Sequence, residues 1–387
     1  MDTVTLNKLS DWAIKHRRHL HQYPELSGQE FETCEYIKKQ LREMEIDLLD
    51  YQAPNVVGYL NGTKGSTTIA LRADMDALPI VEEGEKKYIS KKYGISHACG
   101  HDGHMAILLA VAKWLSENRH KVEANIVFIF QSSEEISPSG AEFLIKQGVL
   151  EDVNAIFGIH LWQPLPKGKV GICSGAMMAS VDDFHIRIEG KGGHGGMPHE
   201  TIDSVYISSL IVNAIQSIIS RRIDTLEPAV ISIGKIEAGD SYNIIPAHVS
   251  MYGAIRTLSH DIRYKIRKEM ENIVEGICNS FGAKGYLDIL GGVPPLINDE
   301  KLSLFVEDIV KKLYGSETFV SLKPTMASED FSYYLAERKG AFIFVGVGGE
   351  KSSYPHHHPK FDIDEDALET AINLLIKIAL NYKKHVI

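Results

Sequence analysis

The sequence has little of what marks a secreted, membrane-bound or nucleic-acid-binding protein. Its N-terminal stretch MDTVTLNKLSDWAIKHRRHL has no apolar signal-peptide core, and later apolar runs are short and interrupted by lysine. We therefore expect no membrane partner and a cytoplasmic location. The 51 acidic residues outnumber the 41 basic residues, which gives a formal charge of −10. Because phosphate binding requires a concentrated basic surface, this balance disfavours a nucleic-acid partner.

Cysteine is also scarce, with four residues in a chain of 387. The four are widely separated, which argues against a disulfide-stapled scaffold. Cys34 and Cys278 fall in helical patterns, where we expect them in the core. Cys99 differs, because the stretch SHACGHDGHM surrounds it with three histidines and an aspartate. The sequence lacks a Gly-x-Ser-x-Gly motif, which argues against a serine nucleophile.

The length of the chain exceeds what one hydrophobic core usually supports, so we expect two domains. Before residue 175, the strand patterns TTIALRAD, ANIVFIFQ and AIFGIHL alternate with amphipathic helices. This order predicts an α/β domain with a mostly parallel, helix-covered sheet. Residues 180–291 instead follow the order β-α-β-β-α-β of a ferredoxin-like unit. We thus predict a discontinuous catalytic domain, residues 1–179 and 292–387, with a ferredoxin-like domain inserted at residues 180–291.

Polar residues follow the predicted parallel strands. Asp74 ends the first strand, Glu134 and Glu135 follow the second, and His160 lies in the third. The cluster around Cys99 precedes the helix between the first two. Ligands of open parallel sheets bind beyond the carboxyl ends of the strands. We therefore expect these four clusters to meet at one edge of the sheet.

Metal ligation is one interpretation of these residues. Cys99 and His101 can turn toward one ion, and the dipole of the following helix favours an ionised thiol; plain packing is the alternative. Adjacent carboxylates point different ways, so Glu135 is the candidate ligand and Glu134 the candidate general base; an exposed acidic loop is the alternative. His160 is either a ligand or a hydrogen-bonded core residue. The late run YPHHHPKF is either a further ligand source or a solvated loop.

A set of segments, in order, resembles a known family of metal-dependent amidohydrolases, those related to aminoacylase and carboxypeptidase G. The similarity is greatest to the branch that holds hippurate hydrolase, bacterial N-acyl-L-amino-acid amidohydrolases and plant indoleacetyl-amino-acid hydrolases. It extends from about residue 15 to about residue 380. The segments are HQYPE, RADMDALP, HACGHDGH, QSSEE, GIHLW, GKGGHGGMPH, YNIIPAHV, ASEDF and HHPKF.

The resemblance implies two divalent metal ions per subunit, with zinc or manganese expected first and cobalt or nickel as further options. It makes Glu134 the general base and Asp74 a carboxylate that orients the ligands. In relatives the last ligand belongs to a His-x-Pro-x-Phe motif, which matches His357, with His356 or His358 as the fallback. The implied ligands are Cys99, His101, Glu135, His160 and His357.

The resemblance also assigns roles in the inserted domain. His194 matches a histidine that steadies the oxyanion, often in the partner subunit's site, so we expect a lid and dimerisation domain and a homodimer or a higher homo-oligomer. Asn243 and Arg256 match groups that bind the substrate. The guanidinium suits the free carboxylate of the substrate because it forms two parallel hydrogen bonds with it.

The implied reaction is hydrolysis of the amide bond of an N-acyl-L-amino acid of the N-acetyl or aroyl type, with Glu134 taking the proton of a metal-bridged water. A dipeptidase or small-peptide peptidase with the same chemistry is one alternative, because such substrates also offer an amide and a carboxylate. A metal-binding protein without catalysis is another. Glu134 beside a ligating Glu135, and Arg256 in a second domain, argue against that last hypothesis.

Overall fold

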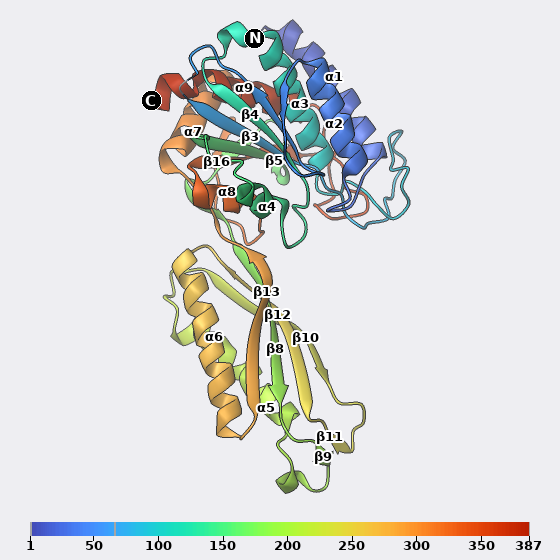
Figure 1. The fold of residues 1–387 in the computed structure, drawn as a ribbon, viewed down its shortest axis with the longest axis vertical. Coiled ribbons are helices and arrows are strands. Elements are labelled where there is room, and N and C mark those ends of the chain that lie inside the picture. The colour runs from blue at the N-terminus through green and yellow to red at the C-terminus, as the bar shows by residue number, and fades with distance from the viewer. Residues whose placement is uncertain (1, 66, 387) are drawn as a thin grey trace. The chain divides into compact units, whose positions relative to one another are not determined.

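The computed structural model describes residues 2–65 and 67–386. The chain forms two compact units, drawn in Figure 1. Unit 1 consists of Met1–Gly175, Ile297–Lys323 and Tyr333–Ile387, and unit 2 consists of Ala176–Leu296 and Pro324–Ser332. In the described part of the chain, none of the helices has the length and apolar character needed to cross a bilayer.

Unit 1 is built on a sheet of eight strands in the order β1-β2-β4-β3-β5-β16-β6-β15. Its four central strands, β4, β3, β5 and β16, are parallel to one another, which confirms the predicted mostly parallel sheet. Antiparallel pairs lie toward both edges. The strands are β1 (Asp47–Leu49), β2 (Val56–Leu60), β3 (Thr68–Asp74), β4 (Asn125–Gln131), β5 (Ala155–Pro166), β6 (Val170–Ile172), β15 (Phe319–Ser321) and β16 (Gly340–Gly348).

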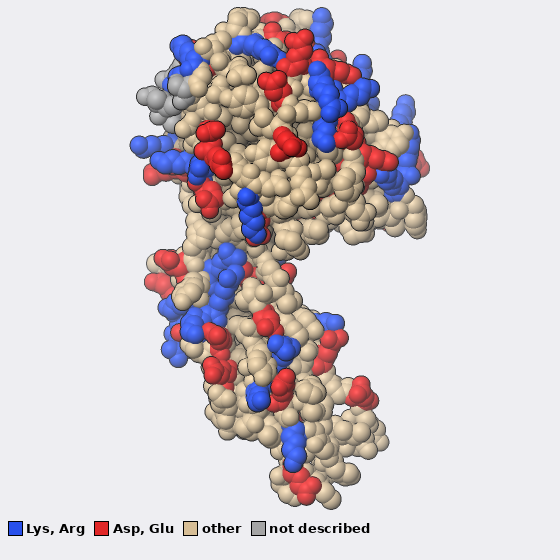
Figure 2. Space-filling view, in the orientation of Figure 1, with Lys and Arg blue, Asp and Glu red and all other residues tan. Residues whose placement is uncertain are grey.

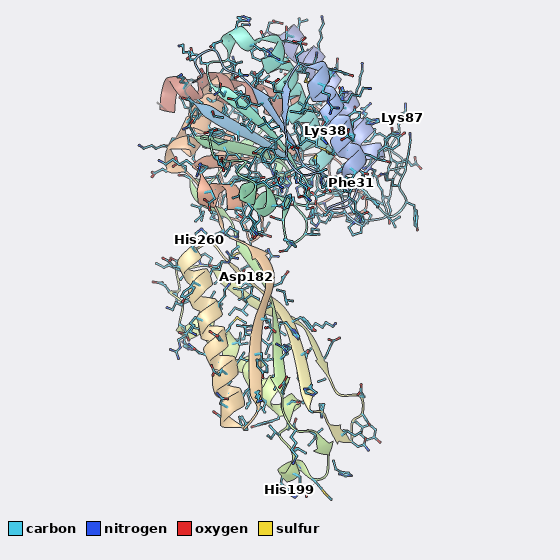
Figure 3. The ribbon with its side chains drawn as sticks, in the orientation of Figure 1. Phe31, Lys38, Lys87, Asp182, His199 and His260 are labelled. Atoms are coloured by element: carbon cyan, nitrogen blue, oxygen red, sulfur yellow. The ribbon has the colours of Figure 1, made fainter. Side chains whose placement is uncertain are left out.

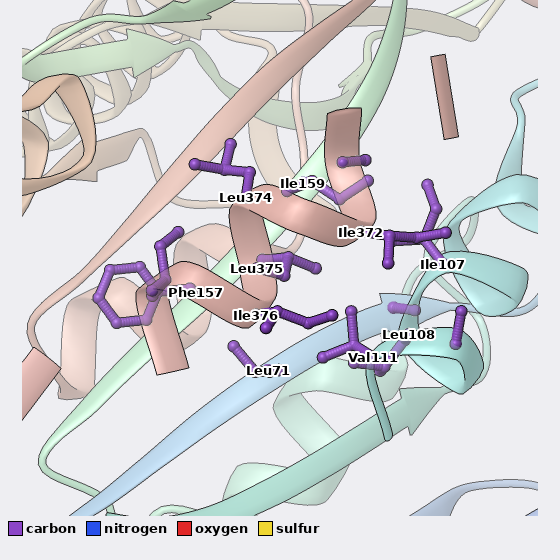
Figure 4. Packing of buried hydrophobic residues seen from close by; sticks show 14 of the residues in the cluster. Leu71, Ile107, Leu108, Val111, Phe157, Ile159, Ile372, Leu374, Leu375 and Ile376 are labelled. Carbon is purple, nitrogen blue, oxygen red and sulfur yellow. The ribbon is translucent and has the colours of Figure 1, made fainter. Parts of the chain in front are cut away.

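Helices cover this sheet and form its core with it. Helix α3 buries almost every side chain, as expected for a helix between a sheet and the outer helices α1 and α9. Leu71 of β3, Val111 of α3 and Leu375 of α9 meet there, each at most 1% exposed (Figure 4). The helices are α1 (Thr3–Gln22), α2 (Phe31–Glu43), α3 (His101–Glu117), α4 (Gly140–Lys146), α7 (Glu300–Tyr314), α8 (Phe331–Glu337) and α9 (Ala367–Val386), with a short 3-10 helix η1 (Arg119–Lys121).

Unit 2 has an antiparallel sheet in the order β10-β12-β8-β13. Inward side chains alternate along β8, and Phe184, Ile186 and Ile188 pack against both helices of the unit. The order β8-α5-β10-β12-α6-β13 is the predicted β-α-β-β-α-β unit. These elements are β8 (Ser180–Glu189), α5 (Ser204–Arg221), β10 (Ala229–Ala238), β12 (His248–Thr257), α6 (His260–Ser280) and β13 (Lys284–Val293).

Short elements complete the chain. The segment Pro324–Ser332 groups with unit 2 although it lies outside residues 180–291, because the N–H of Ala179 donates to the carbonyls of Thr325 (3.1 Å) and Ala327 (2.9 Å). The remaining elements are β7 (Gly175–Met178), β9 (Gly193–His194), η2 (Pro198–Glu200), β11 (Ile244–Ile245) and β14 (Leu296–Asn298).

Candidate metal centre

Three neighbouring strands of unit 1 bring polar side chains to one edge of the sheet. Asp74 is the last residue of β3, and Gln131, its partner in β4, immediately precedes the segment with Glu134. His160 lies inside β5, because that strand continues to Pro166 by pairing with β16. The register pairs Arg72 with Gly158, so His160 is level with Asp74. The expected convergence occurs even though one of its residues is not at a strand end.

Two glycines shape the start of α3. Gly100 has φ +94°, a conformation that favours glycine, and it is the N-cap of the helix that begins at His101. A Cβ on Gly103 would lie 2.5 Å from Cδ1 of Leu161 on β5. The helix therefore starts in close contact with β5, and this contact places Cys99 and His101 beside His160.

The structure brings the five predicted ligands together in unit 1. The Sγ of Cys99 lies 3.6 Å from Nε2 of His160. The Oε1 of Glu135 lies 3.3 Å from Nε2 of His357 and 3.9 Å from Nε2 of His101. Candidate ligand atoms of Cys99, His101 and His160 all lie within 4.8 Å of one another, and so do those of Cys99, Glu135 and His357. Cys99 thus belongs to both groups.

Two buried atoms in this cluster lack hydrogen-bond partners among the described residues, Nε2 of His101 and Oε1 of Glu135. Nδ1 of His101 lies 2.9 Å from the carbonyl oxygen of Asp76, so Nδ1 carries a proton and donates it there. Nε2 is then the ring nitrogen that can offer a lone pair to a cation, once it has released its own proton. Buried polar groups are usually satisfied, and a cation would satisfy both atoms at once. The donor set therefore fits a metal ion.

The pKa values reflect the crowding of negative charge. Burial and the neighbouring Glu135 raise the pKa of the Cys99 thiol. Interactions with the Cys99 thiol and the Glu135 carboxylate raise the pKa of His357 to about 10. Burial alone would lower the pKa of His101, but Asp74 and Cys99 carry it well above its usual range. Without a metal, protons on the histidines balance the acids, and metal binding would release them.

The triple histidine near the C-terminus places its three rings differently. His357 has φ +64°, and its N–H donates to the carbonyl of Ala98 at 2.8 Å, which holds it beside Cys99. Nε2 of His356 instead accepts a hydrogen bond from the N–H of Gln163 at 3.1 Å. Nδ1 of His358 accepts from the N–H of Lys360 at 3.0 Å. His357 is thus the member of the run that joins the ligand cluster.

Carboxylates beside the cluster hold its histidines. Oδ1 of Asp74 lies 2.6 Å from Nδ1 of His104 and 3.8 Å from Nδ1 of His101, so its principal partner is His104. Nε2 of His104 accepts the N–H of Leu161 at 2.9 Å. The carbonyl of Asp76 is the nearer acceptor for His101. Sequence reasoning assigned no role to Asp76 or His104, although both lie in the motifs RADMDALP and HACGHDGH.

Glu134 lies next to the ligand cluster. A carboxylate oxygen of Glu134, one of Glu135 and a ring nitrogen of His101 all lie within 4.8 Å of one another. Glu134 is partly exposed, whereas His101 is 1% exposed. A carboxylate at this position could ligate a cation or exchange protons with a molecule bound beside the cluster.

The predicted residues of unit 2 lie at two separate places. His194 pairs with Ile244 across β9 and β11, and the N–H of Gly195 donates to the carbonyl of Asn243 at 2.9 Å. Arg256 lies toward the other end of the sheet, opposite Val181. The two ends of unit 2 can be found in Figure 3 by their labels: His199 lies near β9, and Asp182 is the residue after Val181. Unit 2 thus brings His194 and Asn243 together but keeps Arg256 apart from them.

Thiol, imidazole and carboxylate ligands lie together at the open edge of a parallel sheet, largely buried apart from His357, with a further carboxylate beside them. This arrangement is typical of a metal-dependent hydrolase. The model of Peptidase family M20/M25/M40 matches residues 70–381. The chain belongs to this family, and it is a metal-dependent enzyme that hydrolyses amide bonds.

Individual relatives are similar over nearly the whole chain. Thermostable carboxypeptidase 1 of Saccharolobus solfataricus is 40% identical over 94% of this chain and 93% of its own length. N-acetyl-L-cysteine deacetylase of Bacillus subtilis is 39% identical over 97% of this chain and 89% of its own. The crystal structure of the Bacillus subtilis YXEP protein, described as a dinuclear metal binding peptidase, is 34% identical and matches with a TM-score of 0.86 over 98% of this chain and 99% of that one.

Proposed function

We propose that this enzyme hydrolyses N-acyl-L-amino acids, of the N-acetyl or aroyl type, to a carboxylic acid and a free amino acid. The observation that carries the proposal is the ligand cluster in which the buried atoms Nε2 of His101 and Oε1 of Glu135 form no hydrogen bond among the described residues, next to the carboxylate of Glu134. The similarity to a deacetylase of N-acetyl-L-cysteine supports the substrate class.

In this proposal Cys99, His101, Glu135, His160 and His357 hold two divalent ions, of which zinc and manganese suit the mixed thiolate, imidazole and carboxylate set best and cobalt or nickel come next. When bound, such ions lower the pKa of water and polarise the carbonyl of the amide. Asp76 and Asp74 orient the histidines through their Nδ1 atoms. The similarity to a dinuclear metal binding peptidase supports the number of ions.

Glu134 is the proposed general base. It removes a proton from the attacking water while the new C–O bond forms at the acyl carbon. It then delivers that proton to the amide nitrogen as the C–N bond breaks, so that the leaving group departs as a neutral amine. Its nearness to His101 and Glu135 supports this role, because the proton has to move beside the cations.

His194, Asn243 and Arg256 are the proposed substrate-contacting residues of unit 2. Nδ1 of His194 accepts the N–H of Gly196 at 2.9 Å, so its proton lies on Nε2, where it can donate to an oxyanion. Arg256 gives one N–H to the carbonyl of Met326 at 2.7 Å and has further donors for a substrate carboxylate.

A homodimer or a higher homo-oligomer follows if these residues act on one substrate. Val249 and Arg256 are seven residues apart on β12, which corresponds to about 23 Å, and His194 lies beyond the Val249 end. A small acyl-amino acid does not span this length. We therefore propose that His194 and Asn243 serve the site of a partner subunit, whereas Arg256 serves the site of its own chain.

A short peptide is the second candidate substrate, because a relative 40% identical is a carboxypeptidase. Both substrates present an amide and a free carboxylate, so rates on N-acetyl amino acids, hippurate and dipeptides separate them. The proposed compartment is the cytoplasm. The four free cysteines support it, because a reducing environment keeps the Cys99 thiol available.

The test of the proposal is Glu134→Gln in enzyme reconstituted with zinc or manganese. We expect kcat on the preferred acyl-amino acid to fall about 10²–10⁴-fold, because the base is lost. Metal content, measured by atomic emission, stays near that of the unchanged enzyme, since Gln at this position disturbs no proposed ligand. The matched control is Glu142→Gln, on α4. Retention of most activity in Glu134→Gln would remove Glu134 from the mechanism.

A further inference from the structure

The segment Ser132–Glu135, which carries the proposed base and a proposed ligand, has an unusual backbone. It follows the end of β4 at Gln131, and Ser133 adopts φ +54° although it is not a glycine. Such a conformation is disfavoured for residues with a Cβ and persists where the surroundings hold it. The position of Glu134 therefore depends on whatever holds the backbone of Ser133.

An open pocket of about 320 Å³ borders the segment on one side, and its walls include Gly28, Ser132, Ser133, Pro138 and Phe143. On the other side the N–H of Gly140 donates to the carbonyl of Ser133 at 3.0 Å. Close-packed neighbours normally fix a buried backbone, and here part of that contact is missing. Hydrogen bonds from other elements must supply the constraint.

Two carboxyl groups from distant elements hold the backbone on either side of Glu134. The N–H of Ser133 donates to Oε1 of Glu30 at 2.8 Å. The N–H of Glu135 donates to Oδ2 of Asp76 at 2.9 Å. Asp76 has a second task, since its carbonyl orients His101. The side chain of Glu30 is linked to the segment that carries Glu134 and Glu135 through this hydrogen bond from Ser133.

Burying the carboxyl group of Glu30 costs free energy that a glutamate on the surface would not lose. Its side chain precedes α2 and is 0% exposed, and its Oε2 has no hydrogen-bond partner among the described residues. Burial, and then the nearby Asp76, raise the pKa of Glu30 to about 7. A buried, half-satisfied carboxyl group is unfavourable. Its retention here is explained if the contact of Oε1 with Ser133 is needed.

We propose that Glu30 is a positioning residue of this enzyme: through the hydrogen bond that it accepts from Ser133 it fixes the backbone that aims Glu134 at the substrate. The inference rests on the proposed role of Glu134 as general base. It requires an acceptor oxygen at the place of Oε1 and does not require a negative charge there.

Substitutions of matched size test this distinction. Glu30→Gln keeps an acceptor oxygen, so we expect kcat within about twofold of the unchanged enzyme. Glu30→Met fills similar space without an acceptor, and Glu30→Asp withdraws the carboxyl by one methylene. Both should lower kcat about 10–100-fold with KM nearly unchanged, because small misplacements of a catalytic group cost rates of this order. Glu32→Ala, at a side chain that is 72% exposed on α2, is the control.

Hydrogen exchange supplies a readout that needs neither substrate nor metal. The Ser133 amide should exchange slowly in the unchanged chain and in Glu30→Gln, and at least tenfold faster in Glu30→Met and Glu30→Asp. Equal protection in all four chains, or an equal loss of kcat in Glu30→Gln and Glu30→Met, would overturn the proposal. If Glu30→Met fails to fold, the Gln and Asp variants still decide it.

The same measurements separate this inference from the proposed function. If the metal-loaded, unchanged enzyme hydrolyses no member of a panel of acyl-amino acids and peptides, the proposed function fails, while the exchange pattern still reports whether Glu30 holds Ser133. If the unchanged enzyme is active and Glu30→Met keeps both its kcat and the protection of Ser133, the function stands and the role of Glu30 falls.

Discussion

The charged groups at the sheet edge of unit 1 and those around Asp182 in unit 2 differ in their balance. At the sheet edge of unit 1, Asp74, Asp76 and Asp102 are each at most 1% exposed. In the sheet of unit 2, Asp182 is 0% exposed and binds two arginines, Arg263 and Arg267 of α6. Figure 2 shows Lys and Arg side chains gathered over this part of α6.

The difference indicates which ligand charge each unit suits. Buried charges are stable when they are paired or bind metals, so the surplus of acid in unit 1 calls for cations. Around Asp182, two partly exposed guanidinium groups face one carboxylate, and this local surplus of positive charge suits an anion such as a carboxylate. A metal-dependent hydrolase of acyl-amino acids has to bind both kinds of group.

Unit 1 meets part of its need with buried arginines, Arg72 of β3, which pairs with Asp74 at 2.7 Å, and Arg17 of α1. Arg17 connects the larger number of segments. Its side chain is 1% exposed and forms ion pairs with Asp102 (2.7 Å), Asp362 (2.6 Å) and Glu365 (3.0 Å). Asp102 follows His101 directly, and Asp362 lies shortly after His357. Arg17 thus ties together the segments that carry two proposed metal ligands.

Arg17→Met should produce the largest loss of stability. It leaves buried carboxylates without their partner, and breaking a buried pair in this way costs about 3–5 kcal/mol. Urea unfolding followed by tryptophan fluorescence measures it, and this signal reports unit 1 because Trp12, Trp114 and Trp162 all lie there.

Arg18→Met is the matched control for that experiment. Arg18 also pairs with Glu365, but its side chain is 49% exposed, so we expect a loss below about 1 kcal/mol. If both variants lost equally little free energy of unfolding, the carboxylates around Arg17 would become neutral or reach water at little cost. The buried acids of unit 1 would then not need a cation.

A heterodimer of two different variants tests whether unit 1 of one chain works with unit 2 of its partner. Glu134→Gln and His194→Ala are each expected to be nearly inactive as homodimers. Co-expressed with different tags and purified as a heterodimer, they should recover about half of the unchanged activity, because one of two sites then has both groups intact. Acyl-amino-acid hydrolysis by the purified heterodimer is the measurement.

The matched control pairs Glu134→Gln with Arg256→Ala. Since Arg256 is proposed to serve the site of its own chain, each site of that heterodimer lacks one group, and we expect no recovery. A His194→Ala heterodimer no more active than its parents would show that His194 does not act across subunits.

Local sequence pattern predicted much of the fold for physical reasons. Strands β3 and β4 are buried at every position, so their sequences are mostly apolar and end in polar residues, although Arg72 lies inside β3. The alternating burial along β8 likewise marks an antiparallel strand with one covered face. These patterns are properties of each segment alone, and so they can be recognised without knowledge of its neighbours.

Contacts between distant segments could not be predicted in this way. Arg17 and Glu365, or Glu30 and Ser133, are far apart in the sequence, and no period or spacing relates them. The choice among the three histidines depends on the φ of +64° at His357, which the run HHH does not reveal. Resemblance to a family identified candidate ligands and one orienting carboxylate, Asp74, whereas Asp76, His104, Arg17 and Glu30 emerged only from the fold.

Asp182→Asn should give the smallest effect and tests the charge balance of unit 2. The amide removes the negative charge between Arg263 and Arg267, whose side chains are 16% and 34% exposed and can turn toward water. We therefore expect a loss of only about 1–2 kcal/mol, below that of Arg17→Met. Hydrogen exchange of β8 and α6 should quicken, by about 5–30-fold for such a loss, while unit 1 stays unchanged. Asp183→Asn, on the exposed face of the same strand, is the control. A loss as large as that of Arg17→Met would mean that unit 2 depends on its buried acid as strongly as unit 1 depends on Arg17.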